Sequence, residues 1–338
     1  MYRLFTEGIL PGVSSVLSFI PTIAAMIFCL ALFRELGIIR GSAARFIMGF
    51  SCSVPAIMSC AGIADKRRRF ITAMLIPYMS CSAKLPIYVM MASMFFPKNS
   101  YIAVGGIYII GIVIALAAFT AAKRLRLLSG SYCEAASSAL CNHQPARHSL
   151  HTSKRFAKPF TRLKRPDMRV VFDEVWSCCT GFVKKAFTVI LAASVVIWLL
   201  QNLDTTFRFT SNIEESLLAQ LGRLVAPLLA PVGFGDWRAA AALITGLSAK
   251  EAVVSTFAVI AGAAGGPALC TMLEDIFSPL SAFCFMVFCL AYMPCIATLA
   301  AIRSVTGRLS ISLAVMTVQT LFAWLLSFLI FHLVTAII

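Results

Sequence analysis

Long uncharged runs dominate the hydrophobic pattern of the chain. Six runs contain no Asp, Glu, Lys or Arg: Gly8–Phe33, Phe46–Ala64, Asn99–Ala122, Ala186–Leu203, Ile276–Ile302 and Leu309–Ile338. Two further runs are nearly uncharged: Phe70–Pro97 contains only Lys84, and Ala239–Leu273 contains only Lys250 and Glu251. A helix needs roughly 20 apolar residues to cross the hydrocarbon core, and helices satisfy their own backbone hydrogen bonds in lipid. The pattern predicts an all-α polytopic membrane protein with about eight hydrophobic helical segments.

A different pattern lies between Glu215 and Pro231. Apolar residues recur there at helical spacing: Leu217, Leu218, Leu221, Leu224, Val225 and Leu228. An amphipathic stretch of this kind is typical of a helix that lies in the membrane interface, so we expect a helix that does not cross the bilayer.

Composition agrees with the membrane class. Hydrophobic residues make up 60% of the chain and charged residues 13%, with a mean hydropathy of +0.89, whereas a soluble domain is about a quarter charged. The net charge of +15 does not indicate nucleic-acid binding, because its largest part lies in one polar stretch: 11 Lys and Arg fall between Lys123 and Arg169.

That basic stretch divides the chain into a first region (residues 1–122), a linker (123–185) and a second region (186–338). Basic loops stay in the cytoplasm, and Asp65–Arg69 is also basic. Both segments then lie inside, and span counting places both termini there too. The linker is either a docking site for a partner or anionic lipid, or a flexible tether, which we prefer because blocks of like charge are usually disordered.

Two segments repeat one unusual motif. Tyr78–Leu85 and Tyr292–Leu299 agree at Tyr, Met, Cys, Ala and Leu. Each follows an apolar segment interrupted by Gly or Ser: Gly49–Pro55 precedes the first copy, and Gly246–Ala252 precedes the second. Chance agreement within apolar sequence is the alternative. Duplicated pairs of broken membrane helices build the substrate site of many transporters, so the pattern predicts two related gate repeats.

Three of the twelve cysteines are candidate metal ligands. Cys52, Cys81 and Cys295 each have a proline nearby, and these prolines are Pro55, Pro86 and Pro294. Proline removes a backbone donor and frees a carbonyl within a helix. A thiol beside such a carbonyl can bind a borderline-soft cation such as ferrous iron in transit. The alternative is a buried thiol in a kinked packing helix.

Charged residues within the apolar runs are further candidates. Lys84, Lys250 and Glu251 each cost a few kcal/mol in hydrocarbon unless they are paired or hydrated. Glu251 can bind a cation directly, and Lys84 or Lys250 can balance its charge when the site is empty. Ser51 and Ser80 lie beside the motif cysteines as pore candidates. A buried structural ion pair is the alternative.

Catalytic motifs are absent from the sequence. It contains no Gly-x-x-x-x-Gly-Lys-Ser/Thr loop, no dinucleotide-binding fingerprint and no His-Glu-x-x-His. We therefore expect a protein that is not an enzyme, and one that holds no cofactor permanently.

At these motifs the chain resembles the ferrous iron transport protein B family. Gly49–Met58 is similar to the first gate motif of that family and Met79–Tyr88 to the next signature. Segments similar to its second half follow in order: Lys184–Trp198, Gly233–Arg238, Ala249–Val254 and Pro294–Leu299. The resemblance implies a multi-pass importer of ferrous iron in the bacterial inner membrane, with pore cysteines at Cys52, Cys81 and Cys295. Ferrous iron is then the transported substrate.

The same resemblance implies partners. Family members usually have an amino-terminal GTP-binding domain, for which this sequence has no motif. The expected partners are the lipid bilayer, a separately encoded GTPase and small iron-transport accessory proteins, with a homo-oligomer as a further option. Two alternatives stay open: a transporter of nucleosides or another organic solute, and a membrane fragment that does not transport.

Overall fold

A computed structural model describes residues 41–63, 66–128, 168–204, 212–262, 266–292 and 295–337, together with isolated positions at 21, 24, 25, 27–29, 206 and 208–210. Helices make up almost all of this part of the chain, and its only β contacts are two isolated bridges, between Leu203 and Phe209 and between Asp204 and Ser216. The predicted all-α membrane class is confirmed.

Over residues 41–128, apart from positions 64 and 65, the helices are α2 (Gly41–Ser51), α3 (Ser53–Ser59), α4 (Lys66–Leu75), α5 (Leu85–Phe95) and α6 (Ser100–Leu128). Short 3-10 turns connect them at η2 (Cys60–Gly62), η3 (Ile76–Tyr78) and η4 (Ser82–Lys84). Most of the predicted basic linker lies outside the described residues, so the division at residues 123 and 185 stays a prediction.

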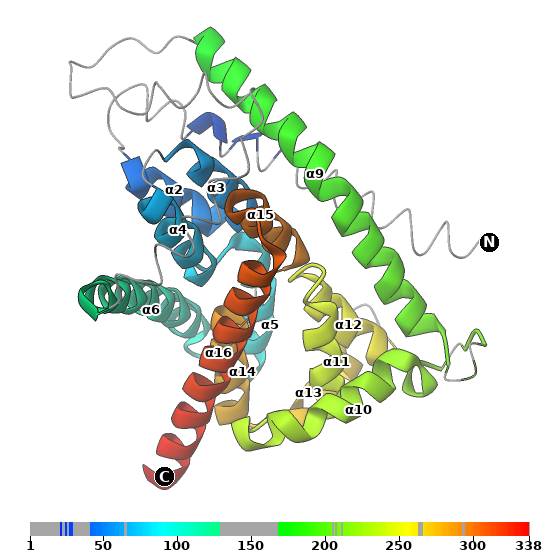
Figure 1. Ribbon diagram of the computed structural model, residues 1–338. Coiled ribbons are helices and arrows are strands. Elements are labelled where there is room, and N and C mark those ends of the chain that lie inside the picture. Colours follow the sequence, from blue (N-terminus) through cyan, green and yellow to red (C-terminus); the bar gives the residue numbers. More distant parts are fainter. Residues whose placement is uncertain are drawn as a thin grey trace.

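Helix α9 (Met168–Asn202) begins within the predicted linker, continues into the second region and runs along one side of the molecule (Figure 1). The second region continues with η7 (Ile213–Glu215), α10 (Leu217–Leu229), η8 (Ala230–Val232), α11 (Trp237–Thr245), α12 (Ala252–Ile260), α13 (Pro267–Ile276), α14 (Pro279–Ala291), α15 (Ile296–Thr306) and α16 (Leu309–Ile337). The amphipathic leucine pattern forms α10, whose first turn is capped by the Ser216 hydroxyl.

Four apolar helical segments among the described residues are long enough to cross a membrane: Arg69–Phe95, Ser100–Ala118, Pro279–Thr306 and Leu309–Ile337. A fifth crossing is reached if Leu217–Val232 and Trp237–Thr245, which meet at 106°, are one broken span. The predicted count of eight stays a prediction, and most of the run Gly8–Phe33 lies outside the described residues.

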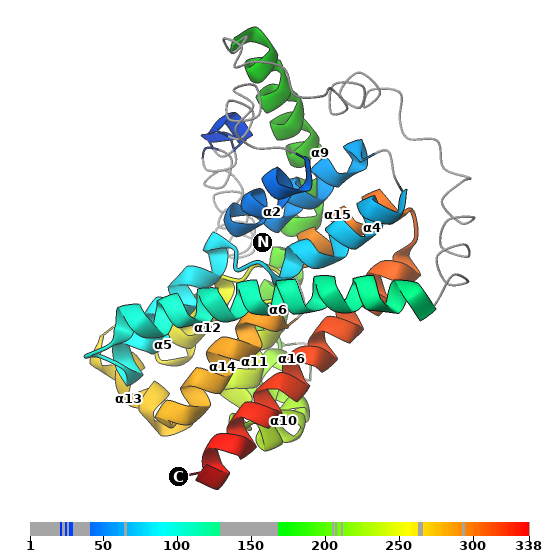
Figure 2. The same ribbon diagram turned by 90° about the vertical axis from the view of Figure 1, so that its left-hand side faces the viewer.

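The core is built around α14. Every residue from Ala282 to Ala291 is buried except Phe283, as expected for a helix that is hydrophobic on all sides. It packs against α5, α6 and α16, and Figure 2 shows α6 crossing it. By contrast, α6 and α16 expose many large apolar side chains, which suits contact with lipid. A second, smaller core joins α3 and α4 of the first region to α15 of the second.

Candidate functional site

The repeated motifs coincide with four interruptions of helical structure. Cys52 is extended between α2 and α3, with φ −149° and ψ 127°. Met79 and Cys81 are extended between η3 and η4. The second region has a turn between α11 and α12, and a last break follows α14, where Tyr292 is extended and Cys295 has φ −59° and ψ 159°. We refer to these as breaks one to four, in chain order.

Hydrogen bonds connect the breaks within each region. In the first region the Ser82 hydroxyl donates to the Ser51 carbonyl at 2.9 Å, which joins break two to break one. In the second region the Ile296 amide donates to the Leu247 carbonyl at 2.8 Å, which joins break four to break three. Carbonyls left without helical partners therefore gain donors from the next break, as buried backbone requires.

Two more hydrogen bonds cross between the regions. The hydroxyls of Ser53 and Thr298 are 2.9 Å apart, and these residues are 245 positions apart in sequence. Lys84 Nζ donates to the Leu290 carbonyl at 2.6 Å. Breaks one, two and four are thus held together at the centre of the molecule.

The three candidate cysteines occupy one kind of position. Cys52 and Cys295 directly precede α3 and α15, and Cys81 directly precedes η4. All three are half-buried, and none of their side chains caps the helix that follows.

The same thiols lie near one another. Cys52 lies close enough to Cys81, Cys295 and Glu251 to interact with them electrostatically, and Cys81 interacts with Cys295 in the same way. Within the described part of the chain, no three His, Cys, Asp or Glu side chains gather closely enough to hold one metal ion together.

The candidate serines differ in their roles. Ser80 is buried, and its hydroxyl donates to the Tyr88 hydroxyl at 3.2 Å. Ser51 is half-buried, and its carbonyl accepts the Ser82 hydrogen bond. Ser80 therefore faces a polar contact within the first region, whereas Ser51 contributes backbone to the junction of breaks one and two.

Lys84, the last residue of η4, places its ammonium group at the carboxyl end of α14. Its side chain is 3% exposed. The Leu290 carbonyl that it contacts would bond the amide of residue 294 in a continuing helix, and Pro294 has no N–H. The ammonium group supplies that donor, and it also interacts favourably with the negative end of the α14 dipole.

Lys250 lies at break three and is also 3% exposed. Its Nζ is 3.2 Å from the centre of the Tyr292 ring at break four, a cation–π contact worth about 2 kcal/mol when desolvated. The Tyr292 hydroxyl donates to the Leu243 carbonyl at 3.3 Å, and the ring stacks on Phe288.

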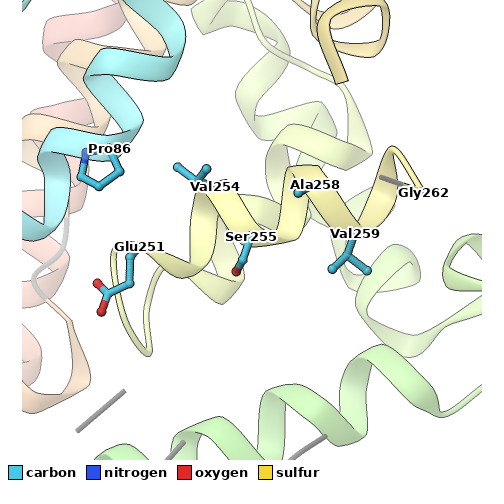
Figure 3. A pocket seen from close by; sticks show the side chains of 7 residues that line it. All are labelled: Pro86, Glu251, Val254, Ser255, Ala258, Val259 and Gly262. Atoms are coloured by element: carbon cyan, nitrogen blue, oxygen red, sulfur yellow. The ribbon is translucent and has the colours of Figure 1, made fainter. Parts of the chain in front are cut away.

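Glu251 directly precedes α12 and lines a groove of about 740 Å³. Figure 3 shows its carboxylate at one end of the groove and Gly262 at the other. The rest of the lining comes from α12 and from the start of α5: Pro86, Val254, Ser255, Ala258 and Val259. The Glu251 Oε1 atom is buried and has no hydrogen-bond partner. This oxygen can therefore bind a cation or accept a hydrogen bond from a water molecule.

Several residues of the site did not stand out in the sequence. Thr298 is fully buried and bonds both Ser53 and the Cys295 thiol. Its only signal is its place in the repeat, opposite Lys84. Tyr292 is likewise a repeated residue, but nothing in the sequence indicates that its ring faces an ammonium group.

Comparisons with known proteins agree with this architecture. A Gate family model described as "Nucleoside recognition" matches residues 183–309. The Fe(2+) transporter FeoB of Staphylococcus aureus is 33% identical over 320 residues, which cover 90% of this chain and 45% of the relative. The Fe(2+) transporter FeoB of Methanocaldococcus jannaschii is also 33% identical, over 90% of this chain and 46% of its own length.

A third relative is the Fe(2+) transport protein A/Fe(2+) transporter FeoB fusion protein of Porphyromonas gingivalis, which is 30% identical over 97% of this chain and 44% of its own length. No solved structure matches. The chain spans about half the length of these relatives. Motifs, membrane helices and similarity agree: the chain is related to the membrane portion of the Fe(2+) transporter FeoB family.

Proposed function

We propose that the protein carries ferrous iron inward across the bacterial inner membrane, between its two gate repeats. The observation that supports this most is the meeting of helix breaks that bring Cys52, Cys81 and Cys295 within electrostatic range of one another. Thiolates suit a borderline-soft cation, and broken helices are accepted at membrane depth where backbone lines a cavity or is buried in protein. The FeoB relatives have the same substrate in their names.

Transport then proceeds by transfer between ligands. No thiol triad encloses an ion among the described residues, and conduction requires binding weak enough for release. Glu251 offers an oxygen ligand and lies within electrostatic range of Cys52, so the cation passes from carboxylate to thiol. Lys84 and Lys250 balance charge around this route when no cation is present.

Radioactive iron uptake by cells that lack their own ferrous importer tests the proposal. Replacing Cys52, Cys81 and Cys295 together with Ser keeps side-chain size and weakens soft ligation, so uptake should fall at least several-fold at equal membrane expression. The matched control is Cys270→Ser, because Cys270 is exposed on α13, away from the breaks. Unchanged uptake in the triple variant would remove thiols from the mechanism.

Glu251→Gln separates a ligand from a structural group. If the carboxylate binds iron, uptake falls while the thermal stability of the same preparation is kept. If the carboxylate only supports the fold, stability falls as well. Normal values for both would contradict either role.

Energy coupling comes from a partner in this proposal. A separate GTPase docks on the cytoplasmic side, together with a small accessory protein of the kind fused to the Porphyromonas gingivalis relative. Purified protein should show no GTP turnover above that of empty membranes. Full-rate uptake by liposomes without a GTPase would contradict the dependence on a partner and leave passive conduction.

A nucleoside transporter is the second candidate, because the family model over residues 183–309 is described as "Nucleoside recognition". The same cells can be tested for uptake of labelled uridine. Uridine uptake without iron uptake would favour that candidate, and the absence of both would favour a fragment that does not transport.

A further inference from the structure

The groove along α12 has a polar pair on one helical face. Glu251 and Ser255 are four residues apart, so their side chains are neighbours on the helix surface, and both line the groove. Ser255 is exposed, and its hydroxyl donates to the Ala252 carbonyl at 3.0 Å. That bond uses the hydroxyl proton and leaves lone pairs of the oxygen available to a cation.

Glu251 also has an unmet requirement. Its Oε1 atom has no hydrogen-bond partner although it is buried, and a buried polar atom without a partner is costly. Lys84, a candidate for charge balance, directs its ammonium to the Leu290 carbonyl. A cation or an ordered water arriving through the groove would satisfy the orphaned oxygen.

The rest of the groove favours passage over tight binding. Beyond Glu251 and Ser255 its lining is apolar, with Val254, Ala258 and Val259 on the same helix. At about 740 Å³ the groove has room for an ion with part of its water shell. Glu251, at one end of the groove, also interacts electrostatically with the Cys52 thiol at break one.

We infer that this groove, the α12 vestibule, is the aqueous route by which a hydrated divalent cation reaches Glu251, with the Glu251 carboxylate and the Ser255 hydroxyl as its first oxygen ligands. The inference rests on the proposed cation transport and adds a route and a residue, Ser255, to it.

Thiol labelling of purified full-length protein in lipid nanodiscs tests the vestibule. Ser255→Cys should react with charged, water-soluble methanethiosulfonate reagents, and the cationic reagent should react several-fold faster than the anionic one because Glu251 attracts it. Cleavage after Lys250 and Phe257 gives a peptide that contains no native cysteine, so mass spectrometry measures this thiol alone. Thr256→Cys is the matched control, because Thr256 is on the same peptide but 1% exposed, and it should stay unlabelled.

Cation binding is tested in the same preparation. Millimolar Mn²⁺, which prefers oxygen ligands, should slow labelling of Ser255→Cys several-fold. Adding Glu251→Gln should abolish both the protection and the preference for the cationic reagent. Val259→Cys, on an exposed position of the same groove, repeats the accessibility test if Ser255→Cys misfolds.

Two results would overturn the inference. Reaction of both cysteine variants with an apolar maleimide but not with charged reagents means that the groove is filled by lipid. Labelling that Mn²⁺ does not slow means that the groove is hydrated but binds no cation. Labelling does not depend on transport, so the two proposals can fail separately. If Mn²⁺ protects Ser255→Cys but the cells take up no iron, the proposed function is wrong and the vestibule is supported. If the cells take up iron but Mn²⁺ gives no protection, the vestibule is wrong and the proposed function is supported.

Discussion

The two copies of the repeated motif, Tyr78–Leu85 and Tyr292–Leu299, both place a cysteine directly before a helical segment but differ in how they are held. The residues that repeat, such as Cys81 and Cys295, occupy equivalent places in the break. The contacts to other segments come mainly from residues that do not repeat.

Position seven of the motif shows this most clearly. It is Lys84 in the first copy and Thr298 in the second. Lys84 reaches the Leu290 carbonyl of the second region, and Thr298 reaches the Ser53 hydroxyl of the first. Equivalent positions therefore both cross between the regions, but one does so with a charge and the other with a hydroxyl.

Position five of the motif shows the same kind of contrast between the two copies. The Ser82 side chain donates to break one, whereas at the equivalent place the Ile296 backbone amide donates to break three. Duplication therefore preserves the position of the helix break, while different side chains at positions five and seven give the two copies different charges and hydrogen-bond donors. Substitutions in one copy at a time should therefore change the free energy of unfolding, measured in detergent, by different amounts.

The largest effect is expected at two glycines beside breaks one and three, Gly49 near the end of α2 and Gly246 directly after α11. A Cβ at Gly246 would lie 2.6 Å from both the Tyr292 hydroxyl oxygen and Val253 Cγ2, whereas at Gly49 the three nearest atoms, which belong to the Met79 and Ile76 side chains, would lie 3.3–3.4 Å away. Gly246→Ala should lower stability by about 2–3 kcal/mol through overpacking, and Gly49→Ala by less than about 1 kcal/mol.

Gly105→Ala is the control for these changes, because its Cβ meets nothing within 4 Å in α6. It should leave stability unchanged or raise it by up to about 1 kcal/mol. Equal losses at Gly246 and Gly49 would show that the two breaks are packed alike.

Lys84→Met comes next. It keeps side-chain length but leaves the buried Leu290 carbonyl without its donor, which should lower stability by about 2 kcal/mol. Lys98→Met, at an exposed lysine, should stay within about 0.5 kcal/mol of the parent. A Lys84→Met variant as stable as the parent would mean that the ammonium does not cap α14.

The hydroxyl link between Ser53 and Thr298 should contribute about 1 kcal/mol. Thr298→Val and Ser53→Ala each break it, so the double variant should lose less than the sum of the single losses. Thr317→Val, whose exposed hydroxyl bonds only its own helix, is the control. Strict additivity in the double-mutant cycle would refute coupling across the two regions.

The smallest effect is expected for Ser82→Ala. Ser82 is exposed, so water can replace its bond to Ser51, and the loss should not exceed about 0.5 kcal/mol. A loss above 1.5 kcal/mol would mean that the junction of breaks one and two is closed to water.

The sequence by itself determined the class of the protein and the places where its helices break. Apolar run length and backbone hydrogen bonding act locally, so the all-α membrane class and the breaks at Cys52, Cys81 and Cys295 could be predicted from neighbouring residues. The count of crossings could not, because a broken segment such as Leu217–Thr245 makes one span or none depending on how its halves pack.

Only the tertiary structure decided what the buried charges face. The sequence predicts that Lys84 or Lys250 balances the charge of Glu251, whereas folding directs Lys84 to a carbonyl 206 residues away. The same packing placed Lys250 over the Tyr292 ring, put Glu251 in the lining of a groove and left one of its buried oxygens without a hydrogen-bond partner. A charge in hydrocarbon must find some partner, but which one it finds depends on the helices that pack beside it, and no local pattern specifies those neighbours.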